Sequence, residues 1–264
     1  MTADGTIYGS ERLAAAYAFS RPPVHPHVAA RVSRRLSPEC PVETALDIGC
    51  GAGASTAAIL PLARRVVGLE PYAPMLRNAS VVVPGAEFYV GRAEALPFQS
   101  SAFALVTAAG ALNYANVALS LSEVARVMLP SGLFVPYDFS AGRRLRGDNR
   151  LSDWYAEFRM RFPSPPGYVL DLRALEYRKC GLDLVAYEEI EVGIHMSLAT
   201  YVDYILGDTG VESALAEGQL EGDVRRLLED RLHSVFSVGE HEVIFDAQIA
   251  YIRSQASPGR RSDA

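Results

Sequence analysis

The chain is predicted to fold as an α/β domain built on a mostly parallel β-sheet with helices on both faces. Strand-like apolar runs alternate with helix-like segments through its first half, which is the pattern of β-α-β crossover units. A glycine-rich turn, ALDIGCGAGAST at 45–56, follows directly on the first of these runs. The 264 residues, of which 49% are hydrophobic and 21% charged, can bury a complete core, so disorder and repeat architectures are excluded.

The elements of the first half are placed by short apolar runs and by stop signals. Predicted strands are residues 43–49, 66–70, 87–92, 103–110 and the segment GLFVPYDFS that begins at Gly132, and predicted helices are 54–64, a segment from about Pro74, and 117–129. The sequence Pro130-Ser131-Gly132 ends the last of these helices. Pro136 lacks the N–H that a central strand uses, so we expect it to mark the end of the strand or a bulge.

The pattern changes after Asp138, where a helical cap is predicted. A helix is expected over 171–182, a long strand up to Met196, helices within 198–236 as a lid between the last two strands, and a final strand over 240–254. An aromatic group at loop positions suits either the core of the cap or a pocket for an apolar ligand; its members are Trp154, Tyr155, Phe158, Phe162 and Tyr168. The predicted plan is an N-terminal helical segment (1–40) that closes the site, a core (41–140, about 171–196 and 240–254), cap insertions (about 141–170 and 197–239) and a disordered tail (255–264).

Composition and charge exclude several classes of function. A formal charge of −6 disfavours a nucleic-acid-binding surface, and the basic cluster at 142–150 is expected to be a solvated loop or to meet an anionic substrate. Apolar runs stay well below the roughly 18 residues of a membrane span, so we expect a soluble, cytoplasmic protein without a membrane partner. Cys40, Cys50 and Cys180 are far apart and are expected to stay reduced, and the histidines and carboxylates show no spacing typical of metal ligands.

The glycine-rich turn fits two patterns that hold different cofactors. Gly49, Gly51 and Ala54 satisfy G-x-G-x-x-A, and Glu70 follows about 20 residues later, as in dinucleotide-binding domains. The same turn also reads Asp47-x-Gly49-x-Gly51-x-Gly53, with an acid just before the first glycine. In either case glycine lets the backbone N–H groups approach a ligand closely.

The second pattern resembles motif I of the class I S-adenosylmethionine-dependent methyltransferases. Three further segments are similar to motifs of that family: VVGLEP at 66–71, GRAEALPF at 91–98 and SEVARVMLPSG at 122–132. Together they cover roughly residues 40–140. The resemblance implies a Rossmann-like, seven-stranded, mostly parallel sheet with an antiparallel last strand. It also implies S-adenosyl-L-methionine as cofactor and S-adenosyl-L-homocysteine as product.

The resemblance implies a set of cofactor-binding residues. They are Tyr17, Arg21, Asp47, Gly49, Cys50, Gly51, Gly53, Glu70, Pro71, Met75, Arg92, Ala93, Glu94 and Ala109. By this resemblance Glu70 holds the ribose hydroxyls, while Tyr17 and Arg21 close over the methionine end and Arg21 pairs with its carboxylate. Arg92 stands where the family commonly has an acid. S-adenosylmethionine carries a sulfonium and no phosphate, which suits a site that is rich in carboxylates and lacks lysine.

Methyl transfer is an in-line displacement at an activated carbon, so the enzyme needs chiefly to position the acceptor and remove a proton. Candidate bases or acceptor-pocket residues are Tyr114, His25, His27 and His195. Ala108, Gly110 and Asn113 are expected near the carboxyl end of the fourth strand, where ligands bind in open α/β sheets. The family often carries H-W at the position of Asn113-Tyr114, so this chain departs from it there.

The sequence therefore predicts a methyltransferase that modifies an O, N or C atom of a small, apolar or aromatic molecule. Specialised metabolism is one setting that fits, and a monomer or homodimer is expected. Two alternatives stay open. An NAD(P)-dependent oxidoreductase would need a hydride-handling pair such as Tyr-x-x-x-Lys, and the sequence contains none. A fold member could also bind the cofactor without transferring methyl.

Overall fold

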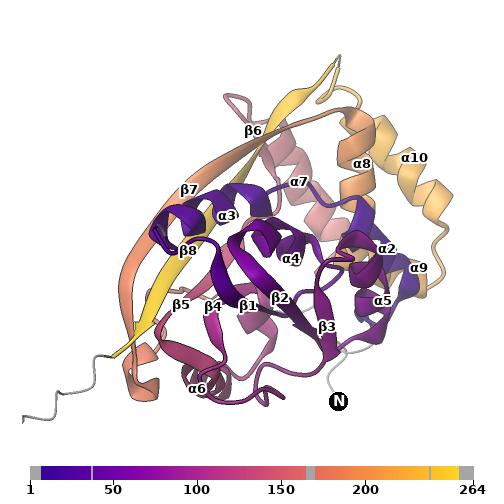
Figure 1. Cartoon of the computed structure of the whole chain (residues 1–264). Helices are drawn as coiled ribbons and strands as arrows, with labels where there is room; N and C mark the ends of the chain where they lie inside the picture. The colour runs from indigo at the N-terminus through magenta and orange to yellow at the C-terminus, as the bar shows by residue number, and fades with distance from the viewer. Residues whose placement is uncertain (1–6, 37, 165–169, 238, 256–264) are drawn as a thin grey trace, which may run out of the picture.

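The architecture is a single twisted sheet with helices on both faces and a helical cap at one side (Figure 1). The structure is a computed structural model that describes residues 7–36, 38–164, 170–237 and 239–255. The tail predicted for 255–264 falls outside these ranges, apart from Gln255, and so does Tyr168. Within the described ranges, no helix is both long enough and apolar enough to cross a membrane.

The sheet has the order β3-β2-β1-β4-β5-β8, and β8 also pairs with β6 and β7. The strands are β1 (Val42–Ile48), β2 (Ala63–Glu70), β3 (Glu87–Val90), β4 (Phe103–Ala109), β5 (Met128–Phe139), β6 (Arg144–Leu145), β7 (Leu182–Met196) and β8 (His241–Ser254). Strands β1 to β5 are parallel, and β8 runs antiparallel to both β5 and β7. The predicted mostly parallel sheet with an antiparallel last strand is confirmed, and the two-residue β6 is an addition that the sequence did not indicate.

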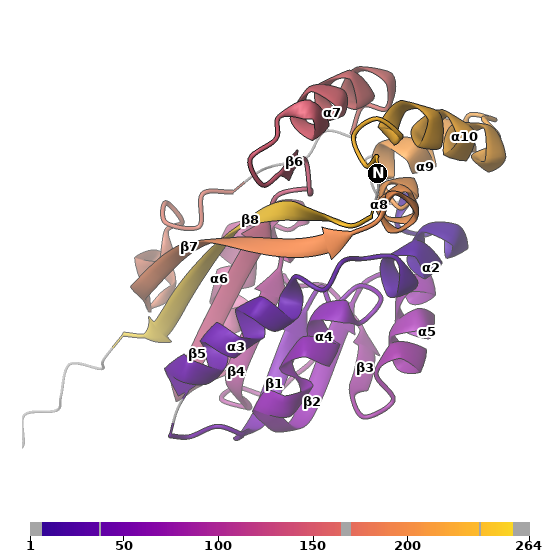
Figure 2. The same ribbon diagram turned by 90° about the horizontal axis from the view of Figure 1, so that it is seen from above.

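Alternate residues of the central strands feed two cores on opposite faces of the sheet. On one face Leu46 and Ile48 pack with Val124 of α6 (Val117–Val127). On the other face Ala45 packs with Val32 of α3 (His25–Leu36), next to α4 (Ala54–Ile59) and the short η1 (Leu60–Leu62). This period of two explains why the strands read as continuous apolar runs: both of their faces are buried. Figure 2 shows α3 and α4 on one side of the sheet and α6 on the other.

Pro136 lies inside β5 and does not end it. It pairs with Ala108 of β4 in the parallel register, and the pairing of β5 with β8 passes from Phe134↔Ile252 to Tyr137↔Ile249. The predicted strand end or bulge at Pro136 is therefore wrong. Pro136 itself is not paired with β8, so no hydrogen bond to β8 depends on the N–H that proline lacks.

The cap consists of α7 (Arg150–Arg161), α8 (Leu198–Leu206), α9 (Thr209–Ala216) and α10 (Glu221–Leu232). The aromatic group of 154–162 was expected at loop positions, and this is wrong because 150–161 is helical. Trp154 stacks on Phe158 with ring centroids 5.2 Å apart, and Phe158 and Phe162 are buried. These rings form the core of the cap with Tyr201 and Phe236. They are spaced along one helix, so their burial requires partner helices that are distant in the sequence.

A helix predicted over 171–182 is also wrong. Only Tyr177–Cys180 (η3) is helical there, as a short 3₁₀ turn that ends at Gly181 with φ 74°. The Tyr177 hydroxyl donates a hydrogen bond to the Leu172 carbonyl at 2.8 Å, which folds the segment back on itself. In an α-helix the Leu172 carbonyl would instead accept from the N–H of residue 176.

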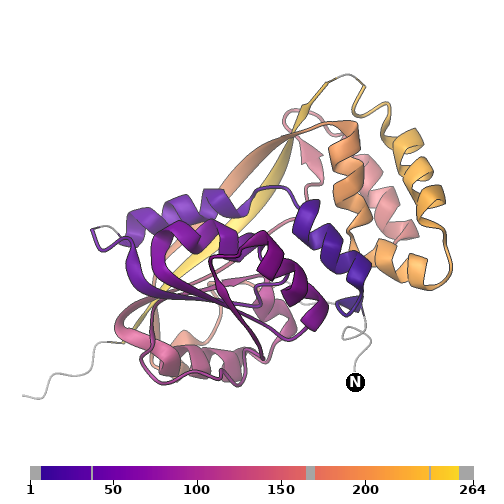
Figure 3. The ribbon, with the colours of Figure 1, turned by 45° about the vertical axis from the view of Figure 1, so that its right-hand side comes forward.

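The N-terminal helix α2 (Glu11–Phe19) lies between the sheet domain and the cap (Figure 3). Glu11 forms an ion pair with Arg77 of α5 (Ala73–Val82), on the sheet side. Arg12 pairs with Glu212 of α9, its Nε lying 2.7 Å from a carboxylate oxygen, and also donates to the Leu206 carbonyl. The helix is thus fastened to both parts of the molecule.

Candidate cofactor site and acceptor pocket

The glycine turn after β1 has a backbone that only glycine adopts easily. Gly49 and Gly51 have φ values of 65° and 53°, in the left-handed region. The N–H groups of Gly49 and Cys50 donate to the Leu69 carbonyl at 2.7 and 3.1 Å, which ties the turn to β2. A Cβ on Gly51 would meet no atom within 4 Å, so this face of the turn is open to a ligand.

Asp47 supports the turn from below. Its carboxylate is fully buried and accepts hydrogen bonds from the hydroxyls of Ser55 (2.6 Å) and Thr56 (2.8 Å) on α4 and of Thr107 (2.9 Å) on β4. Burial raises the pKa of Asp47, and the three hydroxyl groups oppose that rise. The geometry makes Asp47 a positioning residue that joins β1, β4 and the start of α4. Its predicted contact with the cofactor stays a prediction.

Glu70 lies at the carboxyl end of β2, beside the glycine turn. One carboxylate oxygen accepts from the Gly51 N–H at 3.1 Å and the other from the Tyr72 N–H at 3.2 Å. The side chain is only 6% exposed. Burial raises the pKa of Glu70 to about 7, although the two backbone N–H groups favour its charged form. A carboxylate in this position can accept hydrogen bonds from a pair of neighbouring hydroxyls.

The segment GRAEALPF is held against α6 by the side chains of that helix. Glu123 accepts from the Leu96 N–H at 2.7 Å, and Arg126 donates to the carbonyls of Leu96 (2.9 Å) and Phe98 (2.7 Å). Glu94 accepts from the Asn116 N–H at 2.8 Å, at the start of α6. The E-x-x-R pattern of 123–126 thus fixes the loop after β3, a function that its sequence resemblance did not reveal.

Four tyrosines gather beside the glycine turn, and three of them, Tyr8, Tyr17 and Tyr72, pack against a cluster that includes Ala52 of the turn. The ring of Tyr8 lies 5.8 Å from that of Tyr72 after β2, 5.5 Å from Tyr114 after β4 and 6.2 Å from Tyr17 of α2. Beneath them Leu13 and Ala14 of α2 pack with Ala52 and Met75 in one apolar cluster. Tyr8 therefore spans the gap between the ends of β2 and β4.

His25 and Tyr137 form a polar pair beside the carboxyl end of β5. The Nδ1 atom of His25 lies 2.8 Å from the Tyr137 hydroxyl, and Phe139 packs edge-on against the imidazole at 5.2 Å. Burial, together with the positive charge of Arg21, lowers the pKa of His25 to about 4. The imidazole is therefore neutral at pH 7, and its lowered pKa makes it a weaker proton acceptor than an exposed histidine.

Nearby, Asn113 and Asp138 shape the other side of the same strand end. The Asn113 side chain donates to Asp138 at 2.7 Å and accepts from the Leu170 N–H at 3.4 Å. These contacts join the loop after β4 to the segment that follows the cap insertion. Asn113 thus has a structural role at the place where the family often has histidine.

The remaining predicted residues lie in different surroundings. Three of them are buried: Cys50, Met75 and Ala93. Gly53 precedes α4 with φ 96°. Pro71 and Ala109 are half-buried, whereas Arg92 is exposed. Tyr114 is 62% exposed but contacts Tyr8. His27 is exposed on α3, and His195 lies at the end of β7, so neither joins the glycine turn. Their predicted roles as bases stay predictions.

Sequence reasoning missed Tyr8, Tyr72, Tyr137 and Asp138. Tyr72 follows the acid of β2 directly, and Tyr137-Asp138 ends β5, so the rule that ligands bind at carboxyl strand ends could have indicated them. Tyr8 had no such signal. Its position depends on how α2 packs across the sheet.

The residues present fit S-adenosylmethionine. Gly51 leaves an open approach, Glu70 offers a carboxylate for hydroxyls, and Tyr8 and Tyr72 supply aromatic rings that attract a cation. The turn itself contains no lysine or arginine, as expected for a ligand without phosphate. Among the described residues, no group of three His, Cys, Asp or Glu side chains is placed to hold a metal ion.

Comparison with known proteins agrees with this geometry. Residues 46–135, which run from β1 through β5, match the family described as a methyltransferase domain. Residues 46–135 thus form a domain of the class I S-adenosylmethionine-dependent methyltransferase type. The matched segment contains the glycine turn, Glu70 and the loop held by α6, so the resemblance noted in the sequence is confirmed.

Three relatives illustrate the family. An uncharacterised methyltransferase of Bacillus subtilis, YcgJ, is 31% identical over 144 residues, which are 46% of this chain and 57% of the relative. The phthiotriol/phenolphthiotriol dimycocerosates methyltransferase of Mycobacterium leprae is 31% identical over 118 residues, 43% of this chain and 42% of that protein. A putative type II methyltransferase from Anaeromyxobacter dehalogenans shares the fold with a TM-score of 0.63 at 19% identity, over 85% of this chain and 95% of that one. The chain thus spans about half the length of the curated relatives it matches.

Proposed function

We propose that this protein transfers a methyl group from S-adenosylmethionine to an O, N or C atom of a small, largely apolar acceptor. The observation that carries the proposal is the pairing of Gly51 and Glu70 within the matched methyltransferase domain. S-adenosylmethionine, when bound, supplies a methyl group activated by a sulfonium. The protein would hold its ribose with Glu70 and its methionine part beneath the tyrosines.

Support for a small acceptor comes from the cap and from charge. The net charge of −6 disfavours nucleic acid as the acceptor, and the sheet domain is joined to a helical cap with an apolar and aromatic core. The mycobacterial relative is named as a methyltransferase of phthiotriol and phenolphthiotriol dimycocerosates.

His25 is the candidate base that the geometry favours. When its Nδ1–H donates to the Tyr137 oxygen, Nε2 keeps a free lone pair. Burial raises the pKa of Tyr137 well above its ordinary value, so the phenol stays neutral and only orients the imidazole. Positive charge develops on an oxygen or nitrogen acceptor as it gains a carbon, which makes its proton acidic enough for a neutral imidazole to accept.

The cofactor assignment is tested by calorimetric titration with S-adenosylmethionine, S-adenosylhomocysteine and NADPH. We expect saturable binding of the first two, a loss of about tenfold or more in Glu70→Ala, and no change in Glu43→Ala. Glu43 is a suitable control because its side chain is 78% exposed at the start of β1. Binding of NADPH alone would contradict the proposal and favour the oxidoreductase.

Turnover separates a methyltransferase from a protein that only binds the cofactor. Small aromatic and apolar phenols, amines and acids are incubated with S-adenosylmethionine, and S-adenosylhomocysteine release is followed. Once an acceptor is found, His25→Gln should lower kcat by about 100-fold or more and Tyr137→Phe by less, while His233→Gln, an exposed residue after α10, should not change it. Equal rates in His25→Gln and wild type would exclude His25 as the base.

A further inference from the structure

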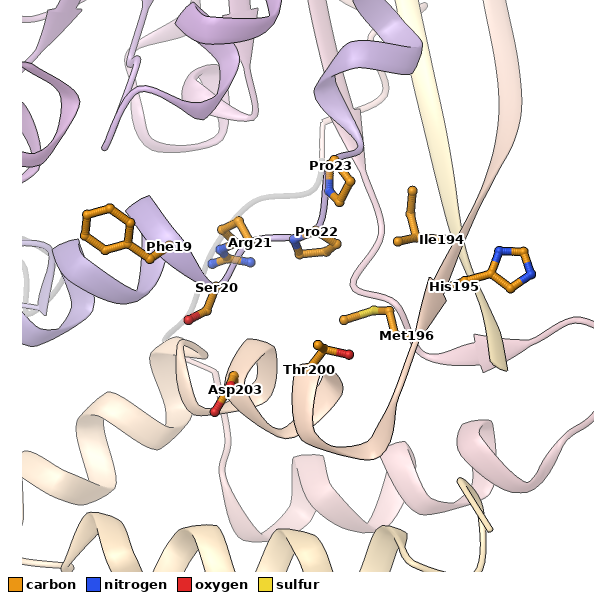
Figure 4. A pocket seen from close by; sticks show the side chains of 10 residues that line it. All are labelled: Phe19, Ser20, Arg21, Pro22, Pro23, Ile194, His195, Met196, Thr200 and Asp203. Atoms are coloured by element: carbon orange, nitrogen blue, oxygen red, sulfur yellow. The ribbon is translucent and has the colours of Figure 1, made fainter. Parts of the chain in front are cut away.

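A second pocket lies between the turn that follows α2 and the start of the cap, and its lining includes the charged side chains of Arg21 and Asp203. The pocket has a volume of about 240 Å³. Figure 4 shows Ser20, Arg21 and Pro22 on one side, Ile194 and Met196 of β7 on another, and Thr200 and Asp203 of α8 opposite Arg21. Its lining includes no residue of the glycine turn, of the end of β2 or of the loop after β3.

Arg21 is a guanidinium without an acidic partner among the described residues. No carboxylate of residues 7–36, 38–164, 170–237 or 239–255 lies within 4.0 Å of it. Instead it rests on the ring of Tyr17, 3.8 Å from the centroid, and faces Tyr204 of α8 at 5.5 Å. Stacking on aromatic rings fixes the planar group and leaves its N–H donors available.

The acids closest to this position are already paired. Asp203, which lines the pocket, lies 2.7 Å from Arg225. Asp208, whose negative charge contributes to the raised pKa of Arg21, pairs with Arg159. It also accepts a hydrogen bond from the Gly210 N–H at 2.8 Å. The positive charge of Arg21 is therefore not neutralised locally, and a partly buried cation of this kind favours an incoming anion.

We propose that Arg21 binds a carboxylate of the acceptor, so that the natural substrate is a small apolar acid. The apolar walls formed by Pro22, Ile194 and Met196 suit the body of such a molecule, and a planar guanidinium suits a carboxylate bidentately. His25 follows Arg21 by four residues and is close enough for its pKa to respond to the arginine.

This inference rests on the proposed function and differs from the role that the family resemblance implies for Arg21. That resemblance pairs Arg21 with the carboxylate of the cofactor. The pocket's lining favours the acceptor instead, because cap and β7 residues surround it. The two assignments predict different losses when the charge is removed.

The test uses the full-length protein and two probes of equal shape, benzoate and benzamide, with phenyl phosphate as a second anion. Ligand-observed NMR and calorimetry measure their affinities for the wild type, Arg21→Gln, Arg21→Lys and the control Arg178→Gln, whose side chain is 85% exposed. We expect benzoate to bind the wild type about tenfold or more tightly than benzamide, to lose that advantage in Arg21→Gln and to keep part of it in Arg21→Lys. If phenyl phosphate binds more tightly than benzoate, Arg21 recognises a phosphate rather than a carboxylate, and the proposed class of substrate is wrong.

Titration with S-adenosylhomocysteine provides the second arm. Its affinity should be the same within about threefold in Arg21→Gln and wild type, since a threefold change is below 1 kcal/mol. A tenfold loss of that affinity with unchanged benzoate binding would assign Arg21 to the cofactor and overturn the inference. Failure of benzoate to bind the wild type more tightly than about 10 mM would also overturn it. Failure of S-adenosylhomocysteine to bind at all would instead contradict the proposed function, independently of the benzoate result.

Discussion

Cofactor affinity should depend on pH through Glu70. Its carboxylate is buried and has a pKa of about 7 without a ligand, and hydroxyl groups of a bound ribose donate to its charged form. Protonation therefore competes with binding. At pH 6 about one molecule in eleven carries the charged carboxylate, and at pH 8 about ten in eleven do, so S-adenosylhomocysteine should bind about tenfold more weakly at pH 6 than at pH 8.

Calorimetry measures both this change and the proton that accompanies it. At pH 7 binding should release about half a proton per site, which titrations in buffers of different ionisation enthalpy detect. Glu70→Gln is the matched variant: its affinity should be lower at pH 8 and nearly constant from pH 6 to 8. His25 does not interfere, because its pKa of about 4 lies below the range. Equal wild-type affinity at both pH values, or the same change in Glu70→Gln, would refute the reasoning.

The raised pKa also has a consequence for stability without ligand. The folded chain holds the Glu70 proton more tightly than the unfolded chain, whose value is near 4.5, so stability is lost as pH rises between these two values. From pH 5.5 to 8 the free energy of unfolding should fall by about 2 kcal/mol through this group alone. Urea unfolding of wild type and Glu70→Gln at both pH values gives the difference. If the difference in free energy of unfolding between wild type and Glu70→Gln does not change with pH, the predicted contribution of Glu70 is wrong.

Three further variants test the site. Asp47→Ala leaves three hydroxyls without their acceptor and should lower the free energy of unfolding by about 3 kcal/mol in urea titration; a loss below about 1 kcal/mol would mean that these bonds are replaceable. Gly51→Ala should lower the free energy of unfolding by about 1 kcal/mol because residue 51 has a positive φ. It should also lower the affinity for S-adenosylhomocysteine by about tenfold or more, and unchanged affinity in calorimetry would mean that the ligand does not approach this face. Tyr8→Ala removes the cover between Tyr72 and Tyr114, so stopped-flow fluorescence should show dissociation of S-adenosylhomocysteine about tenfold faster; a slower rate would argue against a covering role.

Much of the sheet domain could be predicted from the sequence because its signals are local. The strands β1 to β5 follow from short apolar runs that end in glycine or an acid, and the parallel order brings Gly51 and Glu70 together at one edge. Both residues were indicated by spacing alone. Ser55 and Thr56 follow Asp47 by eight and nine residues, across the glycine turn, but Thr107 joins them only because β4 is the neighbour of β1.

The cap and the cover of the site depend on contacts that have no local signal. The sequence predicts loop positions for the aromatic residues of 154–162, whereas Trp154 and Phe158 lie one helical turn apart on α7. Phe158 is buried and Trp154 half-buried in a cluster that includes residues of α8 and α10. Tyr8 meets Tyr114 across 106 positions of sequence, which no periodicity indicates. His25 was one of four candidate bases, and only the fold distinguishes it through Tyr137.

The two ion pairs of α2 connect events that would otherwise be independent. Glu11 holds the helix to α5 beside the glycine turn, and Arg12 holds it to α9 in the cap. Any movement of α2 that admits or releases the cofactor must also disturb the cap. An acceptor that stabilises the cap then raises the affinity for the cofactor. By thermodynamic reciprocity, the cofactor raises the affinity for the acceptor by the same factor. Such a molecule would bind its two substrates cooperatively and release S-adenosylhomocysteine slowly until the methylated product has left.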